Sequence, residues 1–175
     1  MDICIRPIGD VDDEVLSFLR DKLRDIFGCC KVLIPMEIPM DAFNPHRGQF
    51  NSTVILFKIK PLCQIVLGVT EVDLYADRLN FVFGEAEVGG NRAIISLKRL
   101  RPEFYSYEPD YALLKLRALK EAMHEIGHVL GLLHCNDERC VMHFSNSIID
   151  TDIKDWRYCA RCRAVLERKG IKLNL

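Results

Sequence analysis

The stretch that decides the fold is HEIGHVLGLLH, which runs from His124 to His134. On a helix, residues four apart lie one turn above each other, so the imidazoles of His124 and His128 can reach one zinc ion. Glu125 follows on the same helix, beside the metal rather than among its ligands. There it can take a proton from a water molecule. The stretch therefore predicts a helix that carries part of a zinc site and a general base.

The third histidine can join this site only if the helix ends before it. An unbroken helix would carry His134 about 15 Å beyond His124, at a rise of about 1.5 Å per residue. Gly131 lies where the helix must end, because glycine enters the left-handed conformation without a steric penalty. His134 can then fold back as a third nitrogen ligand. One coordination position stays open, which is typical of catalytic rather than structural zinc.

Four of the eight cysteines predict a second zinc site. Cys135 and Cys140 form a CxxxxC pair, and Cys159 and Cys162 form a CxxC pair. Such paired spacings are typical of tetrahedral Cys4 zinc sites, and two disulfides are the alternative. We expect zinc, because no hydrophobic signal peptide precedes the charged residues 10–14, which favours a reducing compartment and a cytoplasmic protein.

The other four cysteines lie in apolar, strand-like stretches, at Cys4, Cys29, Cys30 and Cys63. We expect them to be small buried hydrophobic side chains, because this is the default for a free cysteine. A redox role for the adjacent pair Cys29 and Cys30 is the alternative.

The position of the predicted Cys4 site indicates what its ion would do. Cys135 adjoins His134, and Cys140 lies two residues before Met142. One ion would therefore tie the third histidine to the C-terminal segment and hold His134 in place. We expect residues 1–134 to form one subdomain with the active-site helix. Residues 135–175 would form a small zinc-bound subdomain with little core of its own.

The motif HExxHxxGxxH resembles that of the metzincin clan of zinc peptidases, and the cysteines that follow resemble one branch, the archaemetzincins. That branch shows a cysteine after the third histidine, another a few residues on, a methionine two residues later and a CxxC pair downstream. Here these are Cys135, Cys140, Met142, Cys159 and Cys162. The resemblance covers the chain from the helix onward, and the preceding strands less distinctively. One loop is about one residue shorter than in the family, which threatens nothing essential.

The resemblance implies a zincin-like fold and two further features. Met142 would form a tight turn beneath the catalytic metal, with its sulfur packed under the imidazoles; an ordinary core position is the alternative. An antiparallel edge strand above the zinc, by chain order residues 81–87, would pair with the substrate backbone. An edge merely covered by a loop is the alternative. Residues 143–147, after Met142, would lie near the pocket beside the scissile bond.

Composition agrees with one globular domain and a small appendage. The chain has 175 residues, of which 49% are hydrophobic and 28% charged, with a net charge of −1. This composition argues against a disordered protein and gives no sign of a nucleic-acid-binding surface. No apolar run approaches the length of a membrane span. We expect a monomer that acts on peptides, without nucleic acid or membrane as a partner.

Hydrophobic periodicity predicts an α/β fold with a mixed, mostly parallel twisted sheet of about five strands, a backing helix and the active-site helix. The resemblance implies that this is the α+β, zincin-like form, with an antiparallel edge strand. The predicted strands are residues 3–8, 31–36, 62–69, 81–86 and 93–97. The predicted helices are residues 11–27, 49–60 and 109–131, where residues 49–60 also suit a strand. The apolar side of the last helix would comprise Ala112, Leu116, Leu119, Met123, Ile126 and Leu130, opposite its histidines.

These observations predict a zinc metallopeptidase that hydrolyses peptide bonds with a zinc-activated water and Glu125 as the base. It would carry two zinc ions, one catalytic and one structural. A zinc-dependent peptide-binding protein with little or no turnover is the alternative. A nucleic-acid-binding zinc ribbon is a third possibility, suggested by basic residues around the cysteine pairs. The near-zero net charge argues against it.

Overall fold

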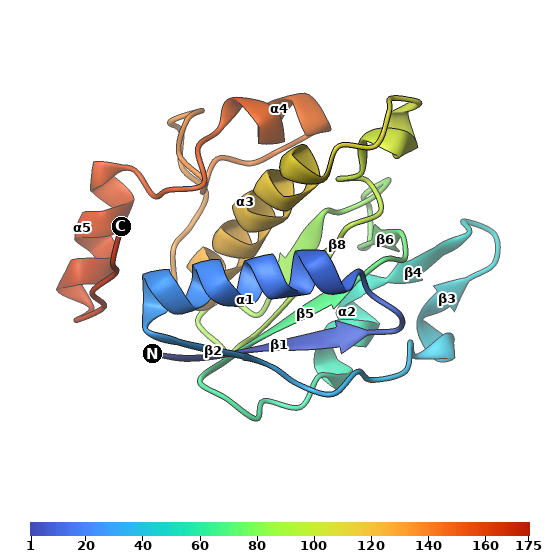
Figure 1. The fold of residues 1–175 in the computed structure, drawn as a ribbon, viewed down its shortest axis with the longest axis horizontal. Helices are drawn as coiled ribbons and strands as arrows, with labels where there is room; N and C mark the ends of the chain where they lie inside the picture. Colours follow the sequence, from blue (N-terminus) through green and yellow to red (C-terminus); the bar gives the residue numbers. More distant parts are fainter.

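A five-stranded sheet of order β2-β1-β5-β8-β7 forms the centre of the computed structural model, which describes all 175 residues (Figure 1). Its strands are β1 (Asp2–Ile8), β2 (Cys29–Val32), β5 (Ile65–Thr70), β7 (Gly84–Ala86) and β8 (Arg92–Ser96). All neighbours pair in parallel except β7, which is antiparallel to β8 at the edge. The predicted mixed sheet with an antiparallel edge strand is confirmed.

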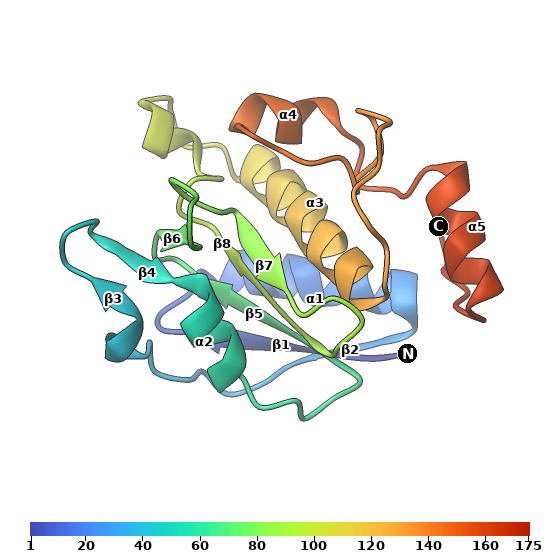
Figure 2. The ribbon, with the colours of Figure 1, turned by 180° about the vertical axis from the view of Figure 1, so that it is seen from behind.

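Helices cover both faces of this sheet, which explains why β1 and β5 are buried along almost their whole length. The helices α1 (Asp13–Phe27) and α3 (Tyr111–Val129) pack on one face, and the short α2 (Ser52–Lys58) packs on the other (Figures 1 and 2). The helix α1 begins two residues later than expected, because the Asp12 carboxylate accepts the backbone N–H groups of Glu14 and Val15.

The ambiguous stretch 49–60 contains both a strand and a helix. The strand β4 (Gln49–Asn51) pairs with β3 (Phe43–Asn44) and β6 (Leu74–Tyr75) in a second, small sheet that the sequence did not predict. The helix α2 follows at once, because the Asn51 side chain accepts the N–H of Val54 and caps it. The prediction of a helix was therefore correct for Ser52–Lys58, and the alternative was correct for the three residues before it.

Two parallel strands differ from their predicted bounds. The strand β2 begins at Cys29, directly after Gly28 ends α1, and stops at Val32; beyond it only Met36 forms an isolated bridge with Ile8. The strand β5 begins at Ile65 rather than at residue 62, because its pairing with β1 starts only there. A short 3-10 helix, η1 (Met40–Ala42), follows β2, and another, η2 (Pro102–Tyr105), precedes α3.

The C-terminal segment forms two short helices, α4 (Ile148–Ile153) and α5 (Ala160–Arg168), which the sequence did not predict. The helix α4 lies over α3 (Figure 1), where the Arg117 guanidinium donates to both carboxylate oxygens of Asp152 at 2.8 and 2.7 Å. Lys120 Nζ donates to the Thr151 carbonyl at 3.0 Å. Buried side chains from both sides of His134 belong to one continuous core.

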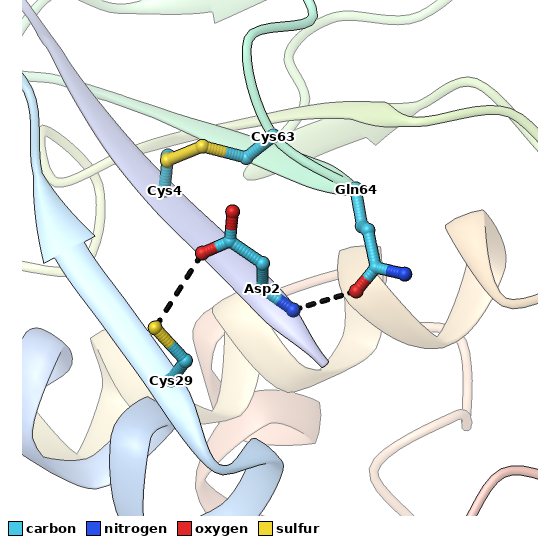
Figure 3. Close-up of a disulfide and its surroundings, with 5 residues drawn as sticks. All are labelled: Asp2, Cys4, Cys29, Cys63 and Gln64. Atoms are coloured by element: carbon cyan, nitrogen blue, oxygen red, sulfur yellow. Dashed lines mark hydrogen bonds between the residues drawn. A yellow bond between two sulfur atoms is a disulfide. The ribbon is translucent and has the colours of Figure 1, made fainter.

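The expectation for Cys4 and Cys63 was wrong, because these two residues form a disulfide (Figure 3). Cys4 belongs to the smaller core cluster, and Cys63, in the turn before β5, packs against the same cluster. Their Cα atoms are 6.0 Å apart. The bond closes a loop with a sequence separation of 59 residues, which typically stabilises a fold by about 2–4 kcal/mol. Cys30 is buried as expected, whereas Cys29 is exposed, with Sγ 3.5 Å from Asp2 Oδ1.

None of the helices combines the length and the apolar character that crossing a bilayer requires.

Candidate active site and metal centres

The helix α3 carries the motif, and its start is fixed by Asp110, whose carboxylate accepts the N–H of Leu113 at 3.0 Å. The predicted apolar side was wrong in its first turns, because Ala112 and Leu116 are exposed. At this end α3 contacts the start of α1 instead, where Lys115 Nζ lies 2.7 Å from Glu14 Oε1. Further along, α3 lies between the sheet and α4, and every residue from position 117 to 127 is buried.

The end of α3 reverses the chain as the sequence indicated. Gly131 has φ +91°, in the left-handed region, and its N–H donates to the His128 carbonyl at 2.9 Å. The N–H of Leu132 donates to the Gly127 carbonyl at 2.9 Å, which completes the termination motif. Lys169 Nζ donates to the Leu130 carbonyl at 3.1 Å. The turn leaves the chain free to return toward the helix with His134.

The structure brings the three histidines together. Nε2 of His124 and Nε2 of His128 are 3.2 Å apart, and the ligating atoms of all three side chains lie within 4.8 Å of one another. A tetrahedral zinc with bonds of about 2.0–2.1 Å requires its nitrogen ligands to lie about 3.3 Å apart. The spacing therefore fits a zinc ion. His124 is 5% exposed, whereas His134 is open to solvent.

Hydrogen bonds orient the two helical imidazoles toward this centre. Nδ1 of His124 lies 2.7 Å from the Val141 carbonyl, and Nδ1 of His128 lies 2.8 Å from the Leu132 carbonyl. A proton on Nδ1 leaves the Nε2 lone pair free for a metal. Burial lowers the pKa of both side chains, well below the usual value for His124. Both effects favour the neutral imidazole that a metal requires.

The Glu125 carboxylate lines a cleft together with His124 and accepts no hydrogen bond from the protein, although the residue is only 5% exposed. Burial raises its pKa well above the usual value; the nearby Glu121 adds to this effect, and Lys154 opposes it. The strand β7 approaches this side chain closely at Gly84, where a Cβ would lie 2.9 Å from Glu125 Cγ. Glycine at this position therefore lets the edge strand lie directly against the carboxylate.

A cleft of about 230 Å³ opens beside Glu125. Residues 79–84 line one wall, and residues 144–146 line the other; His124 and Glu125 belong to its floor. Residues 143–147 were expected near such a pocket, and 144–146 line it, whereas two charged side chains of the cleft, Glu121 and Lys154, were not predicted. Glu121 lies one helical turn before Glu125, so helical periodicity could have revealed it. No local signal marks Lys154, which reaches the cleft from the end of α4.

Met142 is fully buried beneath the histidine-bearing turn of α3. A Cβ on Gly127, between the two helical histidines, would overlap the Met142 sulfur and lie 3.0 Å from Tyr158 Cε1. The Tyr158 hydroxyl donates to the Met123 carbonyl at 2.7 Å. The absence of a side chain at position 127 thus allows the methionine to pack directly against the helix.

Replacing Gly127 by alanine is therefore expected to destabilise the protein. Alanine normally stabilises a helix interior by about 0.5–1 kcal/mol over glycine, but overpacking a rigid core costs about 1–3 kcal/mol. The overlap should dominate, and urea unfolding of Gly127→Ala should show a lower free energy of unfolding and weaker zinc retention. Combining it with Met142→Ala should cost less than the sum of the single changes. Strict additivity would contradict the contact.

The four predicted cysteine ligands form a second cluster. Sγ of Cys135 is 3.8 Å from Sγ of Cys159, and Sγ of Cys140 is 3.8 Å from Sγ of Cys162. Zinc–sulfur bonds of about 2.3 Å in a tetrahedron place the sulfur atoms about 3.8 Å apart, so the cluster fits zinc. Burial raises the pKa of Cys140 to about 11. For Cys159 burial acts in the same direction, but hydrogen bonds from the backbone of Cys162 and from neighbouring thiols outweigh it and lower the pKa to about 7.

Hydrogen bonds link Cys135 of this cluster to the segment around Met142. The N–H of Cys135 donates to the Met142 carbonyl at 3.0 Å, and His143 Nδ1 lies 2.8 Å from the Cys135 carbonyl. Because Cys135 directly follows His134, any ion that fixes its sulfur also limits the movement of the third histidine.

Comparison with known proteins agrees with this geometry. The model of the family described as peptidase family M54 matches residues 36–168. An archaemetzincin of Methanocaldococcus jannaschii is 61% identical over 175 residues, covering 100% of this chain and 98% of that protein. The chain belongs to the archaemetzincins, peptidase family M54. Another archaemetzincin, from Pyrococcus furiosus, is 49% identical over 95% of this chain and 93% of its own length.

Solved archaemetzincin structures share the fold. The crystal structure from Archaeoglobus fulgidus, complexed with malonate, has a TM-score of 0.85 at 43% identity and covers 94% of this chain and 99% of that one. The structure from Methanopyrus kandleri has a TM-score of 0.85 at 34% identity, with coverages of 97% and 95%. The chain is therefore a zinc metallopeptidase, and peptides are its class of substrate.

Proposed function

We propose that the chain hydrolyses peptide bonds at a zinc ion held by His124, His128 and His134, with Glu125 as the general base. The observation that carries the proposal is the convergence of the three imidazoles next to a largely buried carboxylate that accepts no hydrogen bond from the protein. Three protein ligands leave one tetrahedral position open, as a catalytic zinc requires.

When bound, zinc would supply Lewis-acid chemistry, which lowers the pKa of a water molecule and polarises the scissile carbonyl. Glu125 accepts a proton from the attacking water and delivers it to the nitrogen of the leaving amine. The carbonyls of Val141 and Leu132 hold the helical imidazoles in one orientation. A carboxylate kept free of protein donors is able to make both proton transfers.

The substrate backbone would lie along β7. This strand pairs only with β8 within the sheet, so its other edge offers backbone groups to an extended peptide (Figure 2). The contact between Gly84 and Glu125 supports this placement, because a peptide added to β7 would pass directly over the base.

We also propose a second, structural zinc ion, held by Cys135, Cys140, Cys159 and Cys162. It would bind residues 135–175 as a small subdomain around the Met142 turn and keep His134 in place. Four protein ligands close the coordination sphere, which is why this ion would not take part in hydrolysis. We expect the active unit to be one chain, because all proposed ligands come from it.

The test is hydrolysis of a mixed peptide library by the zinc-loaded protein, with products identified by mass spectrometry. We expect new peptide termini that disappear after removal of the metal with a chelator and return when zinc is added back. A protein that retains peptides on the column without cleaving them would instead support the zinc-dependent peptide-binding alternative and contradict hydrolysis.

A further inference from the structure

We infer that the cleft beside Glu125 selects an uncharged amide side chain, glutamine or asparagine, on the residue that follows the scissile bond. This inference rests on the proposed peptidase function. It depends on three side chains to which the proposed mechanism assigns no role: Glu121, Ser145 and Lys154, all of which line the cleft.

The first observation is a buried ion pair under the cleft. The Lys154 side chain is 0% exposed and that of Glu121 is 3% exposed, and Nζ lies 3.5 Å from Oε1. The Thr151 hydroxyl also donates to Oε1, at 3.0 Å. Both contacts engage the same oxygen, which leaves Glu121 Oε2 without a protein donor. The cleft therefore offers a hydrogen-bond acceptor.

The second observation is independent of this pair. The hydroxyl of Ser145 is the one side-chain polar atom that is fully shielded from solvent and has no hydrogen-bond partner. Buried hydroxyl groups are almost always paired, because leaving one unpaired costs free energy. Ser145 lines the cleft, so its hydroxyl is free to pair with a ligand bound there. The wall of the cleft that faces β7 thus supplies a hydrogen-bond donor.

The charges of the cleft exclude other side chains. Lys154 already neutralises Glu121, so a carboxylate entering the cleft would meet Glu121 and Glu125 without a free cation to bind it. A cationic side chain would lie close to the ammonium group of Lys154, which repels it. A hydrocarbon side chain would leave Glu121 Oε2 and the Ser145 hydroxyl both unpaired. An amide avoids all three penalties, because its N–H can donate to Oε2 while its carbonyl accepts from Ser145.

The proton transfers of the mechanism determine which residue of the substrate places its side chain in the cleft. Glu125 returns its proton to the nitrogen that leaves, so the residue bearing that nitrogen must lie next to this carboxylate. The cleft begins at Glu125, and His134 does not line it. The side chain held in the cleft is therefore the one on the amine side of the broken bond.

The experiment compares four peptides that differ only at this residue, which is glutamine, glutamate, lysine or methionine. Methionine matches glutamine in length but cannot form the two hydrogen bonds. We expect kcat/KM for the glutamine peptide to exceed that for the methionine peptide by about 10- to 100-fold, the effect of leaving buried polar groups unpaired. Glutamate and lysine should also be cleaved more slowly than glutamine.

Ser145→Ala is the diagnostic variant. Its hydroxyl has no partner in the free protein, so its removal should not disturb folding, but the preference for glutamine over methionine should fall several-fold. Ser147→Ala is the matched control, because it changes a nearby serine that does not line the cleft, and it should keep the wild-type preference. A second variant, Glu121→Gln combined with Lys154→Met, removes both charges together and should also weaken the selection.

Binding gives a readout that does not require turnover. The affinity of the same four peptides, fluorescently labelled, for zinc-loaded Glu125→Ala protein can be measured by fluorescence anisotropy. We expect the glutamine peptide to bind most tightly. If no peptide is cleaved but this ranking holds, the proposed hydrolysis fails and the selectivity stands. If all four peptides are cleaved equally well, or if the methionine, glutamate or lysine peptide is cleaved fastest, the selectivity is overturned while the peptidase function stands. Equal binding of all four peptides would also overturn the selectivity.

Discussion

Glu125→Gln should lower kcat/KM for peptide hydrolysis by about 10²- to 10⁴-fold, the usual contribution of a positioned general base. The amide has nearly the shape of the carboxylate but cannot accept the proton of the attacking water. Zinc content should not change, because the proposed ligands are the three histidines and not Glu125. The measurement is steady-state cleavage of one peptide, together with elemental analysis of the purified variant.

The same variant should unfold at an equal or higher temperature than the wild type. Glu125 is buried without a protein donor, and its burial raises the pKa of the carboxyl, so the native state gains little from the charge. Glu108→Gln, at an exposed glutamate just before α3, serves as the matched control and should keep full activity. Undiminished hydrolysis by Glu125→Gln would contradict the assignment of the base. Loss of zinc would show that the glutamate is a ligand.

Cys140→Ser should have the second large effect, on stability and metal content together. Structural zinc sites contribute apparent binding free energies of about 10–16 kcal/mol, so losing one ligand should remove much of this contribution. We expect the zinc content to fall from two ions per chain to one. The unfolding temperature should fall by about 10 °C or more. Elemental analysis and a thermal melt measure the two quantities.

Hydrolysis by Cys140→Ser should also fall, because the segment that holds His134 is attached to the cluster through Cys135. Cys29→Ser is the control, since Cys29 is an exposed thiol outside both clusters and its replacement should leave two ions and the melt unchanged. Two zinc ions and a wild-type melt in Cys140→Ser would rule out the Cys4 site.

Local sequence patterns were sufficient for much of the fold. The alternation and helical periodicity of the first 30 residues predicted β1 and α1 to within two residues at each end. The helix of the motif also followed from its own periodicity and from the cap at Gly131. These features depend on contacts between neighbours in the chain, which is why they can be predicted without knowing the rest of the fold.

The errors occur where contacts between distant segments decide the structure. The small sheet of β3, β4 and β6 has strands of two or three residues, too short for a periodic pattern. Ala112 and Leu116 fit the apolar stripe of α3 but are exposed, because burial depends on which neighbour covers each turn. The disulfide between Cys4 and Cys63 joins β1 to the turn before β5, which are neighbours only in the folded sheet, so spacing along the chain does not reveal it.

The sequence by itself determined the chemistry available to this protein: three imidazoles, one carboxylate and four thiols at spacings that suit zinc, and the family to which the chain belongs. Only the tertiary structure decided what surrounds that chemistry. It placed Lys154 of the C-terminal segment against Glu121 of α3, left the Ser145 hydroxyl unpaired and laid β7 over Glu125. Metal ligation follows from ligand type and local helix geometry, whereas the shape and polarity of a cleft arise from side chains that meet only when the chain has folded.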